Sequence, residues 1–239
     1  MPPLAVPGAR AAPVSGYMKQ LDGLRGLAVF AVVLSHFPPH PLVERLLPWG
    51  ILGVQLFFVL SGFLITGILL RSKDIVARGA ATHGSVWRSF YVRRMLRIFP
   101  LYYATLLILF ALNLCDVRPV IGYQLSYLIN FHIASTGLKV GSTTHFWSLA
   151  VEEQFYLCWP LAVYFLNRKA LLRLLSAVIV LAPIVRFAIL STFADTELAR
   201  RIAYVLTPAR ADGLAFGALV AILLREPRFR AAINGMLGK

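Results

Sequence analysis

Charged side chains and cysteines are both scarce in this chain. Only 14% of its 239 residues are Asp, Glu, Lys or Arg, well below the share of about a quarter in soluble domains. The two cysteines, Cys115 and Cys158, lack the spacing of a metal site or a disulfide framework. Together with 59% hydrophobic residues and a mean hydropathy of +0.73, the scarcity of charge excludes an ordinary soluble domain and favours a polytopic membrane protein.

Long apolar runs dominate the sequence instead. A helix needs about 20 apolar residues to cross the core of a bilayer. Five stretches meet this need, and a sixth is apolar apart from the adjacent carboxylates Glu152 and Glu153. The predicted spans are 21–37, 50–70, 98–115, 171–193, 204–224 and, as the sixth, 146–166. The sequence therefore predicts an all-α, polytopic transmembrane helix bundle of about six spans.

One further apolar stretch, 120–134, is short and is interrupted by Gln124, Asn130 and His132. If it does not cross, most lysines and arginines fall on the cytoplasmic side, as the positive-inside rule requires. If it does cross, the later loops change sides, and the lysines and arginines divide into 13 inside and 9 outside instead of 17 and 5. We therefore predict a re-entrant or surface-lying segment here, with both chain ends in the cytoplasm.

The ends of the chain differ from the spans in composition. Residues 1–20 are rich in alanine and proline and contain no apolar signal-peptide core, so they are expected to form a disordered cytoplasmic tail. Residues 226–239 are expected to form a basic cytoplasmic tail. The net charge of +14 does not indicate a nucleic-acid partner, because most of it borders the predicted spans.

The first predicted helix ends at His36. Arg25 lies eleven residues earlier, so both side chains share one helix face, and Asp22 is spaced to pair with Arg25. A neutral imidazole can take a proton from a hydroxyl near neutral pH. His36 is thus a candidate general base, although a histidine marking the helix end at the membrane interface fits its position equally well.

Arg94 and Arg97 are three residues apart on a helix that enters the membrane. Arginine binds phosphate oxygens through two parallel hydrogen bonds, so a phosphate-rich cofactor arriving from the cytoplasm would meet this pair first. The alternative is ordinary positive-inside charge facing anionic lipid, to which Arg88 and Arg93 are assigned.

Glu152 and Glu153 are adjacent carboxylates inside a span, where charge is expensive. Neighbours on a helix point about 100° apart, so one carboxylate is expected to face the bundle interior and the other a different partner. Arg186 is expected to pair with Asp212 or with a glutamate on another helix.

Small residues punctuate the span that begins near Gly53. Gly53, Ser61, Gly62 and Gly67 predict close helix packing. Gln55 and Ser61 are candidates for lining a pore.

Several of these segments together resemble the acyltransferase-3 family of integral membrane acyltransferases, whose members modify sugars of surface polysaccharides. The matching segments are LDGLRGLAVFAVVLSHF, GVQLFFVLSGFLIT, RRMLRIFPLYY, FWSLAVEEQFYL and RADGLAFGALVA. They occur in the family's order between residues 21 and 221.

The resemblance implies roles for six residues. It matches His36 to the family's essential histidine, and Arg94 and Arg97 to the Arg-x-x-Arg motif that holds the acyl-CoA donor. It also matches Arg25 to a functional arginine, and Glu152 and Glu153 to the family's acidic pair. The family's membrane domain has about ten helices, so 21–225 is expected to be such a domain that is incomplete at its C-terminal end.

The resulting hypothesis is transfer of an acyl group, acetyl by preference, from cytoplasmic acyl-CoA to a hydroxyl of an extracytoplasmic sugar or polysaccharide at the plasma membrane. His36 would act as base or as acyl carrier, with no metal. Two alternative functional interpretations remain open. Intramembrane His, Glu and Arg also suit a proton-coupled transporter or flippase, and a shortened chain could be an inactive remnant.

Overall fold

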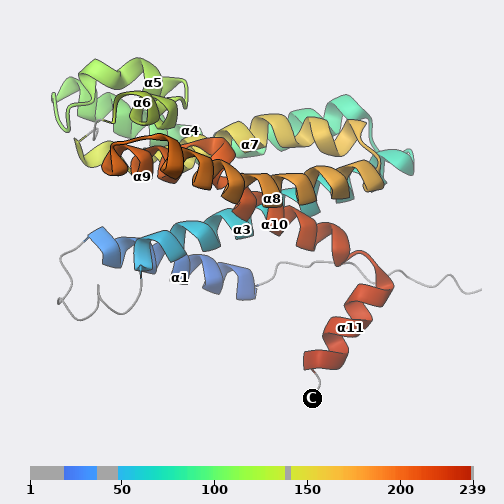
Figure 1. The fold of residues 1–239 in the computed structure, drawn as a ribbon. Coiled ribbons are helices and arrows are strands. Elements are labelled where there is room, and N and C mark those ends of the chain that lie inside the picture. The colour runs from blue at the N-terminus through green and yellow to red at the C-terminus, as the bar shows by residue number, and fades with distance from the viewer. Residues whose placement is uncertain (1–18, 37–47, 138–140, 238–239) are drawn as a thin grey trace, which may run out of the picture. The chain divides into compact units, whose positions relative to one another are not determined.

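The computed structural model describes residues 19–36, 48–137 and 141–237, and this part of the chain is helical and contains no strand (Figure 1). The predicted N-terminal tail lies outside the described residues up to residue 18. The long helices are α1 (Lys19–His36), α3 (Trp49–Ala77), α4 (His83–Ala111), α7 (Phe146–Phe165), α8 (Arg168–Thr192) and α10 (Thr207–Leu223). The shorter helices are η1 (Arg118–Val120), α5 (Ile121–Leu125), α6 (Ile129–Thr136), η2 (Gly141–Thr143), α9 (Thr196–Val205) and α11 (Pro227–Leu237).

The predicted all-α membrane bundle is confirmed. Four helical stretches of the described chain are long and apolar enough to cross a membrane: α3, α4, α8 and the run from α9 through α10. Helices α1 and α7 form where the spans 21–37 and 146–166 were predicted. The side of the membrane on which each end lies stays a prediction.

Two boundaries differ from the prediction. Helix α4 extends back to His83, well before the apolar span predicted at 98–115, because Thr82 caps it by accepting a hydrogen bond from the backbone N–H of Ser85 at 3.2 Å. The predicted span 204–224 is divided at Leu206, which separates α9 from α10. Pro208 explains the division, because in a continuous helix it could not donate to the Tyr204 carbonyl and its ring would clash with that carbonyl, whereas proline suits the first turn of a new helix.

The doubtful segment 120–134 folds into η1, α5 and α6, which are far too short to span a bilayer. Some of its buried polar groups are bonded locally, whereas Gln124 Oε1 and the Tyr127 hydroxyl have no hydrogen-bond partner among the described residues. The hydroxyl of Tyr102 donates to the backbone oxygen of Gln124 at 2.8 Å, and the Gln124 amide donates to the Thr143 hydroxyl at 2.9 Å. The segment is therefore a folded, non-spanning cap, as the charge distribution predicted.

The chain divides into two compact units, Met1–Gly53 and Val54–Lys239, which are described separately. In the first unit, α1 packs against the first turn of α3. A Cβ atom built on Gly53 would lie 2.7 Å from the backbone oxygen of Ala28, which confirms the close approach predicted at Gly53. Asp22 and Arg25 form the expected pair at 3.8 Å.

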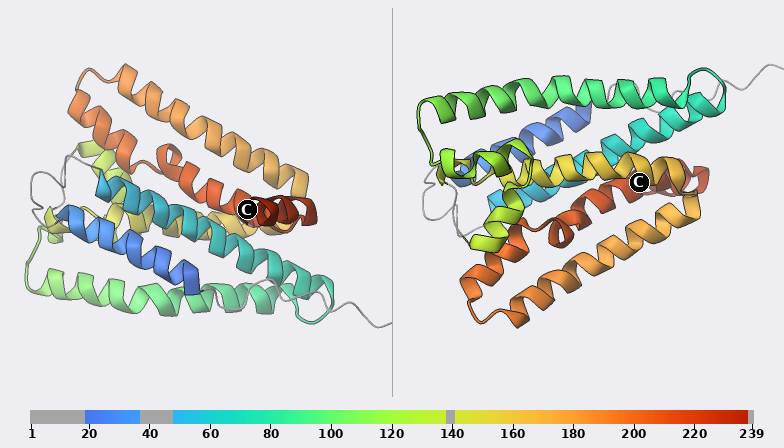
Figure 2. Two further views of the ribbon diagram at one scale, coloured as in Figure 1. Left: turned by 90° about the horizontal axis from the view of Figure 1, so that it is seen from below. Right: turned by 90° about the horizontal axis from the view of Figure 1, so that it is seen from above.

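The second unit is centred on a close crossing of α3 and α10. Cβ atoms on Gly62 and Gly217 would collide with the backbone oxygens of Leu214 and Val59, so only glycine fits at these two positions. Open space surrounds Gly67, and the prediction of close packing there is wrong. Helix α8 runs along α10 (Figures 1 and 2), and α4 lies beside α7, where the Tyr91 hydroxyl donates to the backbone oxygen of Leu157 at 3.3 Å.

Candidate functional site

Helix α7 directs its two adjacent carboxylates into different surroundings. Glu152 is 6% exposed and faces α3. Its Oε1 accepts a hydrogen bond from the Ser61 hydroxyl at 3.1 Å, and its Oε2 accepts one from the Tyr156 hydroxyl at 2.7 Å. Glu152 is thus the carboxylate that faces the bundle interior, and Ser61 supports it rather than lining a pore.

Tyr156 connects this buried group to α4. The guanidinium carbon of Arg94 lies 3.7 Å from the centre of the Tyr156 ring, which is a close cation–π contact. No hydrogen bond or ion pair joins the Arg94 guanidinium to another residue in the described part of the chain, and its Nε is buried. The guanidinium group of Arg94 is therefore held by stacking of its flat face on the Tyr156 ring.

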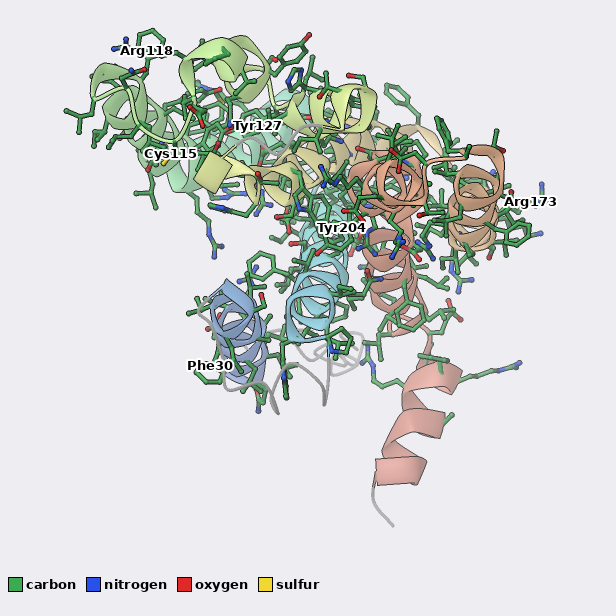
Figure 3. The ribbon with its side chains drawn as sticks, turned by 60° about the vertical axis from the view of Figure 1, so that its left-hand side comes forward. Phe30, Cys115, Arg118, Tyr127, Arg173 and Tyr204 are labelled. Carbon is green, nitrogen blue, oxygen red and sulfur yellow. The ribbon has the colours of Figure 1, made fainter. Side chains whose placement is uncertain are left out.

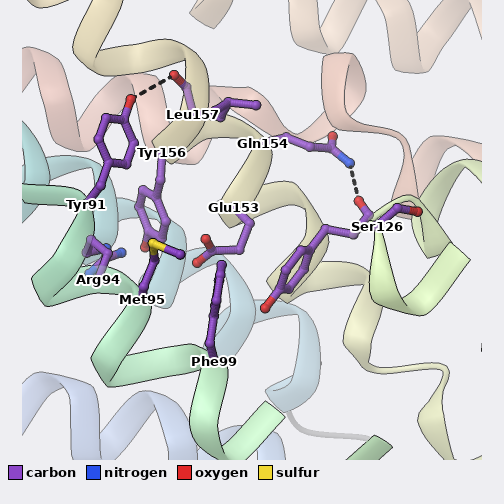
Figure 4. A pocket seen from close by; sticks show the side chains of 10 residues that line it. Tyr91, Arg94, Met95, Phe99, Ser126, Glu153, Gln154, Tyr156 and Leu157 are labelled. Atoms are coloured by element: carbon purple, nitrogen blue, oxygen red, sulfur yellow. Dashed lines mark hydrogen bonds between the residues drawn. The ribbon is translucent and has the colours of Figure 1, made fainter. Parts of the chain in front are cut away.

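A half-open cavity of about 290 Å³ lies between α4 and α7 (Figure 4). Arg94 and Glu153 supply its charged groups, and a buried oxygen of Glu153 has no hydrogen-bond partner among the described residues. The complete lining is Tyr91, Arg94, Met95, Phe99, Ser126, Tyr127, Glu153, Gln154, Tyr156 and Leu157. A small apolar cavity with a few convergent polar groups is typical of a ligand site.

Tyr127 lines this cavity from the turn between α5 and α6. Its φ is +54°, in the left-handed region that a bulky residue rarely adopts. The backbone oxygen of Tyr127 accepts a hydrogen bond from the Gln154 amide at 2.8 Å, and its ring stacks on Tyr102 at 4.7 Å between centres. Burial raises the pKa of the Tyr127 hydroxyl well above its ordinary value, so this phenol stays neutral.

A separate polar network ties α6, α7 and α10 together. The Gln154 amide donates to Asn130 Oδ1 at 2.9 Å, and the Asn130 amide donates to the Thr207 hydroxyl at 2.9 Å. The Thr207 hydroxyl in turn donates to Gln154 Oε1. Asn130 is fully buried. Its network fixes the Gln154 side chain, which in turn holds the backbone of Tyr127.

Three further charged residues within the predicted spans are paired or stacked: Arg186, Asp212 and Arg210. Arg186 forms an ion pair with Asp212 at 2.8 Å, which confirms the predicted partner. Arg210 lies over the rings of Tyr204 and Trp147 at 4.4 and 5.8 Å, and its Nε donates to the backbone oxygen of Tyr204 at 2.9 Å. In Figure 3 Tyr204 lies among the side chains of the helical bundle, whereas the exposed side chain of Arg173 points outward from α8.

The predicted site residues fall into two groups. His36 and Arg25 belong to the first unit: α1 ends at His36, whose side chain lies outside the described part, and Arg25 is half-buried on α1. The second unit brings together Glu152, Glu153 and Arg94. Arg97 shares helix α4 with Arg94 but is exposed and does not line the cavity.

Sequence reasoning missed the tyrosines that organise this site. Tyr156 follows Glu152 by four residues, which is the spacing of side chains that meet on one helix face; that signal was available. Tyr127 carried no comparable signal, because its position depends on the left-handed backbone between α5 and α6. No group of three or more His, Cys, Asp or Glu side chains within the described ranges is arranged to hold a metal ion.

A sequence model of the acyltransferase-3 family, described as an acyltransferase domain, matches residues 18–234. The match covers almost the whole chain, and the chain belongs to this family.

Named relatives are similar over parts of the chain. A protein of Bacillus subtilis named as a candidate peptidoglycan O-acetyltransferase, YrhL, is 33% identical over 194 residues, which cover 73% of this chain and 28% of the relative. The peptidoglycan O-acetyltransferase OatA of Listeria monocytogenes is 32% identical over 158 residues, which cover 60% of this chain and 24% of OatA. The chain thus spans about a quarter of the length of the curated relatives it matches. No solved structure matches it.

Proposed function

We propose that this domain is the membrane part of an O-acyltransferase of the cell envelope. It moves an acyl group, acetyl by preference, from acyl-CoA at the cytoplasmic face of the plasma membrane to a hydroxyl of an extracytoplasmic sugar or polysaccharide. The family assignment, the apolar helices and the names of the relatives support this proposal.

The donor site of the proposal is built from arginines. Arg94 and Arg97 lie one turn apart on α4, where their guanidinium groups bind the phosphates of acyl-CoA, and Arg25 assists from α1. The observation that carries the proposal is the Arg94 guanidinium at the cavity. Among the described residues no hydrogen bond or ion pair holds this guanidinium. The Glu153 carboxylate in the same cavity acts on it electrostatically without a direct bond, so the N–H groups can still meet an anionic ligand.

The catalytic step of the proposal uses His36. Its imidazole takes the proton from the acceptor hydroxyl while the sugar oxygen attacks the thioester carbonyl. The C–S bond breaks, and the CoA thiolate takes up the proton. Alternatively the imidazole nitrogen attacks first and carries the acyl group as a covalent intermediate. Glu152 and Glu153 are the candidates for orienting the imidazole, and Glu153 is the one that borders the cavity.

The test measures transfer of radiolabelled acetyl from acetyl-CoA to polysaccharide or lipid-linked sugar in membranes containing the chain. The parent is compared with His36→Ala and with Arg94→Lys/Arg97→Lys. Arg88→Lys/Arg93→Lys is the matched control, because both control arginines are exposed on the same helix and neither lines the cavity. We expect transfer to be lost in the first two variants and kept in the control.

Equal loss in the control variant would contradict the donor role of Arg94 and Arg97, and near-normal transfer by His36→Ala would contradict the role of His36. Failure of the parent to bind CoA would favour the alternatives, a proton-coupled transporter or an inactive remnant. CoA binding without transfer would mean that this chain holds the donor site but lacks part of the catalytic pore.

A further inference from the structure

The contact between Arg94 and Tyr156 leaves the hydrogen-bonding edge of the arginine unused. A guanidinium group meets an aromatic ring through its flat face and meets an oxyanion through its N–H edge, so the two contacts do not compete. The distance of 3.7 Å from the guanidinium carbon to the ring centre shows that the face is occupied. The ring therefore holds the cation by its face. No described residue accepts a hydrogen bond from the guanidinium, whose Nε is buried, so its terminal N–H groups are left for a ligand in the cavity.

The ring is itself anchored at its far end. The Tyr156 hydroxyl donates to Glu152 at 2.7 Å, and Glu152 accepts a second hydrogen bond from Ser61 at 3.1 Å. Tyr156, Glu152 and Ser61 are only 3%, 6% and 4% exposed. Because buried, fully bonded polar groups are costly to rearrange, the chain of contacts from α3 through α7 restricts where the ring can lie.

We propose that Tyr156 is a positioning residue for the acyl-CoA donor: its ring holds the Arg94 guanidinium at the cavity with the N–H edge turned to the donor phosphates, and Glu152 and Ser61 hold the ring. This inference rests on the proposed function, in which Arg94 binds those phosphates. It gives Glu152 a role that does not require contact with substrate. It also predicts that lysine will be a poor replacement for Arg94, since an ammonium group has no flat face to stack.

The experiment measures the affinity of the full chain in lipid nanodiscs for CoA. We expect Tyr156→Phe, which keeps the ring but loses the hydroxyl that bonds to Glu152, to bind CoA more weakly than the parent but more tightly than Tyr156→Leu. Loss of the ring in Tyr156→Leu should weaken binding by about 3- to 30-fold, the range that corresponds to a cation–π contact. Tyr164→Leu is the matched control, because Tyr164 lies on the same helix and does not line this cavity; its CoA affinity should not change.

Two further measurements separate positioning from simple packing. Replacing Tyr156 with phenylalanine that carries increasing numbers of fluorine atoms keeps the shape of the ring but weakens its attraction for a cation. CoA affinity should fall stepwise along this series while the unfolding temperature stays nearly constant. In an Arg94→Ala background, Tyr156→Leu should cause no further loss, because residues that act through one contact are not additive.

Each outcome decides the proposal. A flat fluorine series, or an equal loss from Tyr156→Leu with and without Arg94, would overturn the positioning role. If CoA binding depends on Arg94 but not on the Tyr156 ring, this inference fails and the proposed function stands. If the parent does not bind CoA, the donor site of the proposed function fails as well. A folding failure of Tyr156→Leu leaves the fluorine series to decide.

Discussion

Glu152 and Glu153 are neighbours in the chain but lie in opposite environments on α7. Both oxygens of Glu152 accept hydrogen bonds inside the bundle, whereas Glu153 borders a cavity and has a buried oxygen without a hydrogen-bond partner among the described residues. A step of one residue turns a helix by about 100°. That single step separates an enclosed face, which supports structure, from an open face, which can meet a ligand.

The difference follows from what packs on each face. The enclosed face meets α3, and α3 in turn crosses α10 at backbone contact through Gly62 and Gly217. The open face meets α4 and the turn at Tyr127, where large side chains leave a cavity of about 290 Å³. We therefore expect changes on the enclosed face to cost stability, and changes on the open face to cost activity.

The largest loss of stability is expected from Gly62→Val, which disturbs the crossing of α3, the helix on the enclosed face, with α10. The new side chain would collide with the backbone of Leu214 and push α3 from α10. Overpacking of a close crossing should lower the free energy of unfolding by about 3 kcal/mol or more. Denaturation of the detergent-purified chain measures this, with Gly67→Val as the control, because open space surrounds Gly67. Equal losses at the two positions would contradict the crossing.

Glu152→Leu should have the next largest effect. It leaves the buried hydroxyls of Ser61 and Tyr156 without their common acceptor, at a cost of about 2–4 kcal/mol of unfolding free energy. Adding Ser61→Ala and Tyr156→Phe to Glu152→Leu removes both stranded donors and should restore part of the loss. No recovery in this triple variant would show that the hydrogen bonds are not the cause. Denaturation curves of the single and triple variants decide between these outcomes.

Asn130→Ala tests the network that joins α6, α7 and α10. The substitution removes partners of Gln154 and Thr207 and should cost about 1–3 kcal/mol. Because Gln154 also holds the backbone of Tyr127, quenching of tyrosine and tryptophan fluorescence should become easier near the cavity. Ser135→Ala is a suitable control, since Ser135 is exposed on the same helix and bonds only to the backbone oxygen of His132 among the described residues. An equal loss of stability in Ser135→Ala would show that α6 as a whole is sensitive to substitution, and that the Asn130 network is not the specific cause.

Glu153→Gln should change stability least, by within about 1 kcal/mol, because the buried oxygen has no partner to lose among the described residues. Under the proposed function, acetyl transfer should nevertheless fall by about 100-fold if this carboxylate orients the catalytic imidazole. Labelled acetyl transfer and denaturation, measured on the same preparation, test both statements. A large loss of stability with normal transfer would reverse the contrast between the two faces of α7.

Much of the fold follows from local patterns in the chain. Apolar runs of sufficient length predicted the membrane helices, and the balance of positive charge predicted that 120–134 does not cross. Helix spacing predicted that Asp22 pairs with Arg25 and that the two glutamates diverge. The N-terminal extension of α4 and the break at Leu206 were not predicted. The signals for them, a capping threonine and a single proline, act within one helical turn, whereas the spans were predicted from apolar runs of about 20 residues.

The sequence by itself determined that this protein is an all-helical membrane protein of the acyltransferase-3 family, because hydrophobic length, charge bias and motif order are properties of the chain alone. The tertiary structure alone decided that Glu152 is enclosed and Glu153 open, and that Arg94 rests on Tyr156. Those outcomes depend on which helices approach each face of α7, and these helices, α3 and α4, come from other parts of the chain.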